Sequence, residues 1–308
     1  MTTPAPTSTT ELHPASTPGP VALTVRDLET MTAFYRRLLG LDELARDGNA
    51  VVLGTPEGTA LLGLLENPDA PEPAPDATGL YHLAVVLPTR QDLARWFTHA
   101  FPLGLRIGQS DHYTHEAFYL HDPEGNGIEV YQDWPQEQWP FDRAARRMTP
   151  GAAQREDIRL RELLNTPDTD QVWNGAPAGT RMGHVHLKMA DADATRDFMA
   201  GGLGLNLTAQ SPDLVFAAAG DYHHHVGNNA WRSRGGPVPT PGSRGLHHWT
   251  LEVPDAAELT RTVERLETAG YAVQDAPGGI QSLDPSGNRV IITAGQAQVQ
   301  DVLAALRG

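Results

Sequence analysis

Three side chains that can bind a metal or move a proton fall within one short stretch, residues 110–131. They are His112, Tyr119 and Glu129. Glu129 stands between two branched apolar residues, and burying a carboxylate there is costly unless a positive group receives it. A glutamate on an isolated strand would usually face solvent, but the histidine and tyrosine nearby favour a functional site.

The residues between these side chains predict a β-hairpin. Residues 122–127, DPEGNG, contain a proline with a fixed φ and glycines that can take a positive φ, which is typical of a tight turn. Strand-like runs flank the turn at residues 117–120 and 127–131. We therefore expect Tyr119 and Glu129 on two neighbouring strands, on which side chains alternate between the two faces.

This stretch resembles the signature of the extradiol ring-cleaving dioxygenases, which belong to the vicinal oxygen chelate (glyoxalase/bleomycin-resistance) superfamily. The matching residues are His112, Phe118, Tyr119, Asp122, Pro123, Gly125 and Glu129. Ser110 departs from the signature, which usually has Gly, Asn, Thr or a branched apolar residue there. The resemblance implies that Glu129 is an iron ligand and that His112 and Tyr119 lie beside the substrate.

Composition narrows the classes of partner. The chain has 38 acidic and 23 basic residues and a formal charge of −15, which argues against nucleic-acid and anionic-membrane partners. It has no cysteine, so a metal must be held by His, Asp or Glu. Residues 1–18 do not read as a signal peptide, and no stretch has the length of a membrane span. We expect a cytoplasmic protein that acts on small molecules; the sequence leaves a homo-oligomer open.

One pattern, a strand followed by a helix and three strands, occurs four times along the chain. We call these copies modules one to four; they cover residues 19–67, 79–133, 182–232 and 245–297. The βαβββ unit is the module of the vicinal oxygen chelate fold. The resemblance therefore predicts an α+β protein in which four modules form two domains with cupped mixed sheets.

The remaining segments complete the expected domain organisation. The two halves cover residues 19–133 and 182–297, and residues 1–18, rich in Thr, Pro, Ser and Ala, are expected to be a disordered tail. Residues 134–181 are expected to connect the halves and to contain one helix near residues 155–164. Residues 298–308 are expected to form a C-terminal helix.

Counting from shared landmarks shows which modules retain metal ligands. In the family, one module contributes a first-strand histidine, and its partner contributes a first-strand histidine and a last-strand glutamate, which together form a two-histidine, one-carboxylate face. Module one has Pro20 at the histidine position, and module four has Ile291 where module two has Glu129. First-strand histidines remain in the other three modules: His82, His184 and His248.

Only modules two and three together hold a complete ligand set, namely His82, Glu129 and His184. We therefore predict that module two pairs with module three, and module one with module four. A run of three histidines, residues 223–225, is expected on the last strand of module three. The family has an acid/base histidine near this place, and the register favours His224.

Several assignments remain open at this point. A rival metal site in modules three and four would use three histidines, His184, His224 and His248. His186 could replace His184, and His248 could replace His82, if the register is shifted. His115 is close enough in sequence to take the place of His112.

The resemblance implies Fe(II) as cofactor and a catechol-type diol and O₂ as substrates, with meta cleavage of the ring. His224 would exchange protons with the diol, and Tyr119 and His112 would hydrogen-bond to it. One alternative is a glyoxalase-like lyase or isomerase with another divalent ion, although such sites usually carry a second carboxylate or a glutamine. Another is a non-catalytic binding protein of the bleomycin-resistance kind, although such proteins lack the ligands.

Overall fold

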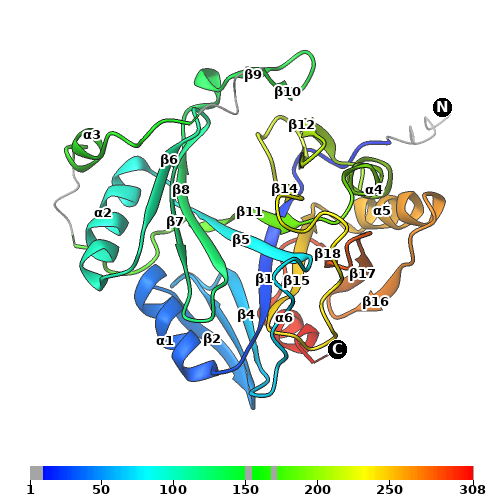
Figure 1. The fold of residues 1–308 in the computed structure, drawn as a ribbon, viewed down its shortest axis with the longest axis horizontal. Coiled ribbons are helices and arrows are strands. Elements are labelled where there is room, and N and C mark those ends of the chain that lie inside the picture. Colours follow the sequence, from blue (N-terminus) through cyan, green and yellow to red (C-terminus); the bar gives the residue numbers. More distant parts are fainter. Residues whose placement is uncertain (1–9, 150–154, 168–171, 308) are drawn as a thin grey trace, which may run out of the picture.

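Two eight-stranded mixed sheets make up most of the protein (Figure 1). The computed structural model describes residues 10–149, 155–167 and 172–307. The strand order in one sheet is β16-β17-β18-β15-β1-β4-β3-β2, and in the other it is β12-β13-β14-β11-β5-β8-β7-β6. The first sheet is built by modules one and four and the second by modules two and three. We call them the outer-module sheet and the inner-module sheet.

The strands of the outer-module sheet are β1 (Thr17–Val25), β2 (Asp42–Asp47), β3 (Ala50–Gly54), β4 (Ala60–Glu66), β15 (Gly245–Val253), β16 (Gln274–Ala276), β17 (Gly279–Leu283) and β18 (Arg289–Ala294). Those of the inner-module sheet are β5 (Gly79–Val86), β6 (Gly108–Asp111), β7 (His115–His121), β8 (Gly127–Asp133), β11 (Arg181–Lys188), β12 (Asn206–Ser211), β13 (Leu214–Ala218) and β14 (Val226–Asn229). In the connecting segment, β9 (Phe141–Asp142) and β10 (Arg147–Met148) form a small separate hairpin.

The helices are α1 (Leu28–Leu39), α2 (Arg90–Ala100), α3 (Leu160–Leu164), α4 (Ala192–Arg196), α5 (Ala256–Thr268) and α6 (Val299–Ala305). A π-helical turn, residues 197–202, continues α4. None of the helices in the described part of the chain is both long and apolar enough to span a membrane.

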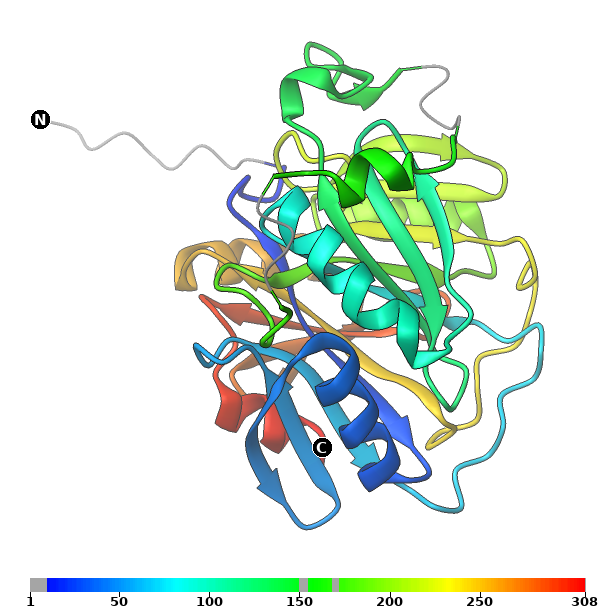
Figure 2. The same ribbon diagram turned by 90° about the vertical axis from the view of Figure 1, so that its left-hand side faces the viewer.

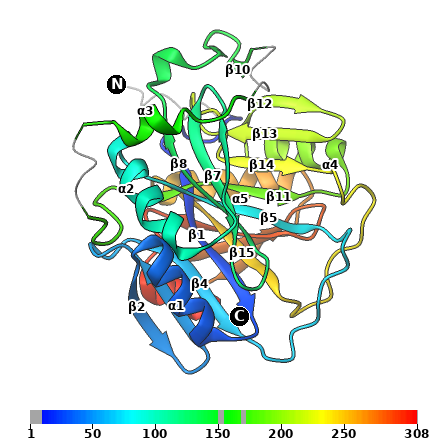
Figure 3. The ribbon, with the colours of Figure 1, turned by 60° about the vertical axis from the view of Figure 1, so that its left-hand side comes forward.

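The predicted α+β fold class is confirmed, and the sheet topology agrees with the predicted pairing of modules. Strand β5 pairs antiparallel with β11, which joins module two to module three. Strand β1 pairs antiparallel with β15, which joins module one to module four. Figure 3 shows β7 and β8 on one side of the central strands β5 and β11, with β12, β13 and β14 on the other.

One large core joins the two sheets and their helices, because alternate residues of each strand face it. Leu83 and Val85 of β5 and Trp249 of β15 belong to this core, together with Tyr35 of α1 and Trp96 of α2. The intervening residues of the strands face the opposite side of each sheet. The first-strand histidine of module two, His82, is on that opposite side, which explains how it can reach a site outside the main core.

The expected disordered tail needs a correction at its C-terminal end. Residues 1–9 lie outside the described residues, but β1 begins at Thr17. Leu12 is buried in the main core, and its backbone N–H donates to the carbonyl of Gly204 at 2.7 Å. Tertiary contacts such as these place a segment whose composition alone indicates disorder.

The other segments differ less from expectation. In the connecting segment α3 covers only Leu160–Leu164, the C-terminal end of the helix expected near residues 155–164; residues 150–154 and 168–171 lie outside the described residues. The expected C-terminal helix is present as α6. It lies against the strands of the outer-module sheet (Figure 2).

Candidate active site

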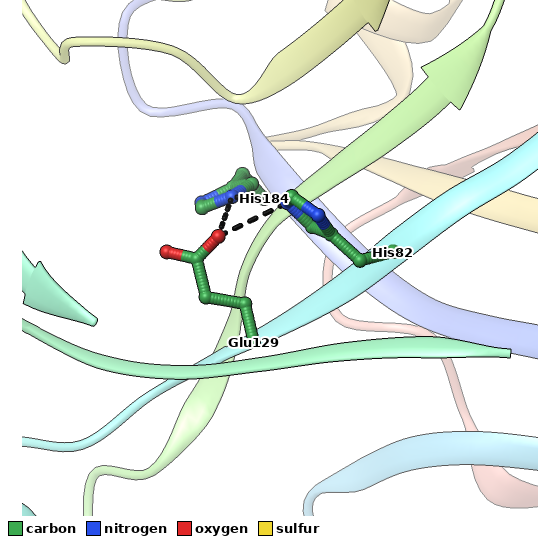
Figure 4. Close-up of side chains that lie close together, drawn as sticks. All are labelled: His82, Glu129 and His184. Carbon is green, nitrogen blue, oxygen red and sulfur yellow. Dashed lines mark hydrogen bonds and ion pairs between the residues drawn. The ribbon is translucent and has the colours of Figure 1, made fainter. Parts of the chain in front are cut away.

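Three ionisable side chains from three adjacent strands point at one place (Figure 4). They are His82 on β5, Glu129 on β8 and His184 on β11. The strand register explains this, because Ala84 of β5 pairs with Glu129 on one side and with His184 on the other. His82 lies two residues before Ala84 and so shares its face. The small alanine leaves room for the three longer side chains above it.

A glycine lets β8 start close enough to β5 for this register. A Cβ atom at Gly127 would collide with the carbonyl oxygen of Tyr81, the residue before His82. Any other residue at position 127 would push the two strands apart. The glycine after the hairpin turn therefore sets the approach of Glu129 to His82.

The distances between the three ligand atoms fit one side of an octahedral metal site. Glu129 Oε2 lies 3.0 Å from His82 Nε2 and 3.2 Å from His184 Nε2, and the two Nε2 atoms are 3.3 Å apart. Two ligands at right angles, each about 2.1 Å from a divalent ion, are about 3.0 Å apart. The donor set and its spacing therefore suit an ion with three protein ligands and further positions left open.

The protonation of these groups also suits a metal. Burial alone would raise the pKa of Glu129, but the interaction with His184 and hydrogen bonds from His115, His184 and His82 bring it well below its usual range. Burial lowers the pKa of His184, against the opposing effect of Glu129. At neutral pH the site therefore presents a carboxylate beside a neutral imidazole, which are the forms that bind a metal.

The alternative ligands are placed elsewhere. His186 Nε2 lies 3.1 Å from Asn229 Nδ2, and it does not join the cluster of His82, Glu129 and His184. His248 is on β15 in the outer-module sheet, where its Nδ1 lies 2.7 Å from that of His247. Among the described residues, the three histidines of the rival site are not assembled into a metal-ligating group.

A cavity lies beside His82, Glu129 and His184, and His112 and Tyr119 form a pair on its wall. His112 Nε2 and the Tyr119 hydroxyl are 2.8 Å apart. Burial lowers the pKa of His112 to about 2 and raises that of Tyr119 well above its usual value. The imidazole is therefore neutral and the phenol keeps its proton, so that the Tyr119 O–H can donate to His112 or to a molecule in the cavity.

His115 does not replace His112; it contacts the carboxylate instead. Its Nε2 lies 3.2 Å from Glu129 Oε1, the oxygen that faces away from His82. Its Nδ1 lies 2.7 Å from the hydroxyl of Thr114, and its ring stacks on that of His112 with centroids 4.6 Å apart. His115 thus orients Glu129 from outside the ligand cluster, as groups around metal ligands commonly do.

The three consecutive histidines do not lie on a strand, which corrects the prediction for residues 223–225. They precede β14, which begins at Val226. His225 faces inward and accepts a hydrogen bond at Nδ1 from the backbone of Ala219. His224 stacks on Phe216, with ring centroids 4.1 Å apart, and lines the cavity beside His184.

Asp133 and Tyr222 were missed by sequence reasoning, although both are connected to His224. His223 Nδ1 lies 2.8 Å from His224 Nδ1, and His223 Nε2 lies 3.0 Å from Asp133 Oδ1. Tyr222 donates its hydroxyl proton to Asp133 Oδ2 at 2.8 Å. Asp133 is the last residue of β8, four positions after Glu129, and this shared strand is the one signal in the sequence that could have pointed to it.

These groups line a cavity of about 270 Å³ with a strongly aromatic wall. His82, Glu129, His184 and His224 are at its surface, with His112 and Tyr119. Tyr81, Phe216 and Trp231 add apolar ring faces. Tyr81 and Trp231 are 43 % and 48 % exposed, so aromatic surface continues from the cavity to solvent. The cavity suits a small, flat molecule with polar atoms on one edge.

Comparisons with known proteins agree with the fold. A model of the glyoxalase/bleomycin resistance protein/dioxygenase superfamily matches residues 17–130 and 181–292. The chain is 33% identical over 279 residues to a catechol-2,3-dioxygenase from Bacillus subtilis (strain 168), a match that covers 90% of this chain and 96% of the relative.

Solved structures share the fold at lower sequence identity. A candidate dioxygenase from Bacillus subtilis subsp. subtilis str. 168 superposes with a TM-score of 0.65 at 15% identity, over 94% of this chain and 87% of the other. Glyoxalase I from Zea mays superposes with a TM-score of 0.57 at 16% identity, over 91% and 92% of the two chains. At these identities the likeness establishes a common fold and no more.

Proposed function

The chain belongs to the glyoxalase/bleomycin resistance protein/dioxygenase superfamily, and from this premise we propose that it is an extradiol ring-cleaving dioxygenase that uses Fe(II) and O₂ to open catechol-type diols. The observation that carries the proposal is the convergence of His82, Glu129 and His184, with ligand atoms 3.0–3.3 Å apart. The relative named catechol-2,3-dioxygenase, matched over 90% of this chain, supports the choice of reaction.

The metal ligands of the proposed enzyme are the three groups of this cluster, one from each of three strands. When bound there, Fe(II) supplies open positions for a diol and O₂ and an electronic connection between them. Glu129 is held in place by His115, and the strand register fixes the two histidines. The protein therefore determines where the substrate oxygens must lie.

The proton transfers of the proposed reaction fall to residues around the cluster. His224 Nε2 is the candidate base for a diol hydroxyl, since its ring lines the cavity and its Nδ1 faces His223. The Tyr119 O–H, beside His112, is placed to hydrogen-bond to a substrate oxygen as negative charge develops on it. The ring of the substrate would lie among Phe216, Tyr81 and Trp231, whose ring faces would pack against it.

The direct test is reconstitution of the purified protein with Fe(II) without oxygen, followed by addition of catechol. We expect no reaction until O₂ is admitted, and then the yellow absorbance of a ring-opened semialdehyde with one O₂ consumed per catechol. Reconstitution with Zn²⁺ is the control, since Zn²⁺ accepts the same ligands but has no redox chemistry.

The outcomes separate the alternatives. A glyoxalase-like lyase or isomerase would turn over its substrate without O₂ and would work with redox-inactive ions. A non-catalytic binding protein would take up an aromatic ligand and consume neither catechol nor O₂ with any metal. Either result would overturn the proposal.

A further inference from the structure

A chain of three hydrogen-bonded side chains leads from the C-terminal end of β8 to the cavity. It begins at Asp133, whose Oδ1 lies 3.0 Å from Nε2 of His223. It continues from Nδ1 of His223 to Nδ1 of His224, 2.8 Å away. Among the described residues, no hydrogen bond involves Nε2 of His224, although its ring lines the cavity. The far nitrogen of His224 is thus left for a molecule in the cavity.

The direction of each hydrogen bond in this chain follows from its first member. An ionised carboxylate only accepts, so Nε2 of His223 must carry a proton and donate it to Asp133. His223 is buried between the rings of His115 and Trp139, which disfavours a charged imidazolium, so its Nδ1 is an acceptor. Nδ1 of His224 must then be the donor, because one of the two facing nitrogens has to carry a proton.

We propose that Asp133, acting through His223, fixes the tautomer of His224 so that the proton is on Nδ1 and the lone pair of Nε2 faces the cavity. Asp133 and His223 are then positioning residues, and His224 is the group that meets the substrate. This inference rests on the proposed function only for the use of His224 as a base. The tautomer itself follows from the hydrogen bonds and from the burial of His223.

The residues around His223 hold its ring in this arrangement. The ring of His223 is buried, stacked on His115 at 4.8 Å between centroids and met edge-on by Trp139 at 5.0 Å. Its backbone carbonyl accepts a hydrogen bond from the buried Thr208 hydroxyl at 2.5 Å. His223 therefore has little freedom to turn its ring and exchange the roles of its two nitrogens.

A second hydrogen-bonded pair fixes the other oxygen of Asp133. The Tyr222 hydroxyl lies 2.8 Å from Asp133 Oδ2 and also 2.8 Å from the Tyr131 hydroxyl. Because Tyr222 gives its proton to the carboxylate, Tyr131 must donate to Tyr222. A side chain at Gly183 would collide with the Tyr131 hydroxyl, so this glycine keeps the space that the network needs.

Asp133→Asn is the variant that tests the proposal. Tyr222 donates to Oδ2, so the asparagine should keep its carbonyl oxygen there and turn its NH₂ group towards His223. His223 Nε2 would then accept, its Nδ1 would carry the proton, and His224 would be forced to protonate Nε2. A comparable carboxylate-to-amide change in a serine-protease triad lowers kcat by about 10⁴ through the wrong tautomer. We expect a fall in kcat of about 10²-fold or more, with unchanged iron content and little change in KM.

Tyr222→Phe is the matched control. It removes the other hydrogen bond of the same carboxylate but leaves the bond from Oδ1 to His223 in place. A structural disturbance around Asp133 would lower kcat in both variants. The proposal predicts a large loss in Asp133→Asn and a small one in Tyr222→Phe, and equal losses would overturn it.

The tautomer can also be read without turnover, by NMR of protein labelled with ¹⁵N-histidine and loaded with diamagnetic Zn²⁺. We expect the Nδ1–H form of His224 in the wild type and the Nε2–H form in Asp133→Asn. An Nε2–H form in the wild type, or the same form in both proteins, would overturn the proposal whether or not the protein cleaves catechol. A changed tautomer with wild-type kcat would instead remove His224 as the base and leave the metal centre of the proposed function unaffected.

Discussion

The two sheets have the same topology, but one surrounds an aromatic cavity with side chains that could hold a metal ion, and the other is filled. In the inner-module sheet Glu129 stands opposite Ala84, and in the outer-module sheet Ile291 stands opposite Thr250 in the same parallel register. On the first strand of module one, Pro20 stands at the position that His184 occupies in module three. A shared fold thus fixes where ligands can be, and only the side chains decide whether a site exists.

The outer-module sheet buries its open face under the C-terminal helix. Val302, Leu303 and Leu306 of the α6 segment pack on Ala22 and Val52 of this sheet. Gly63 on β4 faces the same helix, since a Cβ atom there would lie 3.2 Å from Leu306. The side of the sheet that corresponds to the cavity is therefore part of a hydrophobic cluster, and it contributes stability where the inner-module sheet contributes a pocket.

The largest effect is expected from Glu129→Gln, which removes the charge of the carboxylate and keeps its volume. Neutral glutamine is a poor ligand for a divalent ion, so iron content should fall sharply and ring cleavage should drop by at least about 10³-fold. Metal analysis after gel filtration, together with O₂ uptake, checks both. If the variant kept its full iron content and full turnover, the hairpin would have a structural role only. Ile291→Gln at the matching place in the other sheet is the control and should leave iron content unchanged.

Smaller losses are expected from side chains that line the cavity without holding the metal. Tyr119→Phe and His224→Ala should retain iron and lower kcat by about 10²-fold, because each removes one proton donor or acceptor. Iron content and kcat are measured on the same preparation. Loss of iron in His224→Ala would favour a metal site that includes this histidine, and wild-type kcat in both variants would exclude the roles assigned to them.

Shortening a buried side chain at the end of α6 should lower the stability of the protein and leave turnover unchanged. Leu306 is fully buried, and Leu306→Ala should lower the free energy of unfolding by about 2–5 kcal/mol. Leu214→Ala, at a half-buried position on the cavity wall, should cost less. Urea unfolding monitored by circular dichroism gives both values. Comparable costs in the two variants would contradict the view that only the outer-module sheet is filled.

The smallest expected effect is on the pH dependence of folding stability, to which His225 and Glu252 contribute in opposite directions. Burial lowers the pKa of His225 to about 3 in the folded protein, so this histidine binds fewer protons than in the unfolded chain and weakens folding as pH falls below about 6.5. Burial raises the pKa of Glu252, on β15, to about 7, so the stability it contributes is present at low pH and is lost as pH rises through 7.

Glu252→Gln tests this contrast. It should remove the part of the stability loss that develops between about pH 4.5 and pH 7, and it should leave the acid destabilisation by the buried histidines. Urea midpoints of the metal-free protein across this range measure the effect. An unchanged pH profile would mean that Glu252 is ionised in the folded state.

How much the sequence could predict depends on whether a feature is set by register or by packing. The convergence of the three side chains could be predicted because a strand fixes the direction of its side chains, so that positions can be counted from Pro123 to Glu129 and from Asp191 back to His184. The link from Asp133 to His223 could not, because it joins the end of one strand to an irregular loop 90 residues away. No local pattern specifies such a contact.

The same distinction explains the two corrections. The sequence predicts three successive histidines on a strand, yet His225 turns inward and stacks on Tyr222 with centroids 4.6 Å apart, so the chain enters β14 only at Val226. The C-terminal helix and the burial of Leu12 depend on tertiary contacts with distant strands. The sequence predicts the helix but not the face that it covers, and composition gives the wrong state for residues 10–18.

The most direct test of the central claim is the position of a bound metal. Crystals soaked with Fe(II) without oxygen, or with Mn²⁺, should give one anomalous peak about 2.0–2.2 Å from His82 Nε2, Glu129 Oε2 and His184 Nε2. Two other outcomes would contradict the account: a peak at the neighbouring group of His115, Asp133 and His223, or one at His248 in the outer-module sheet. Absence of a peak at the predicted position, in crystals that take up the metal elsewhere, would contradict it as well.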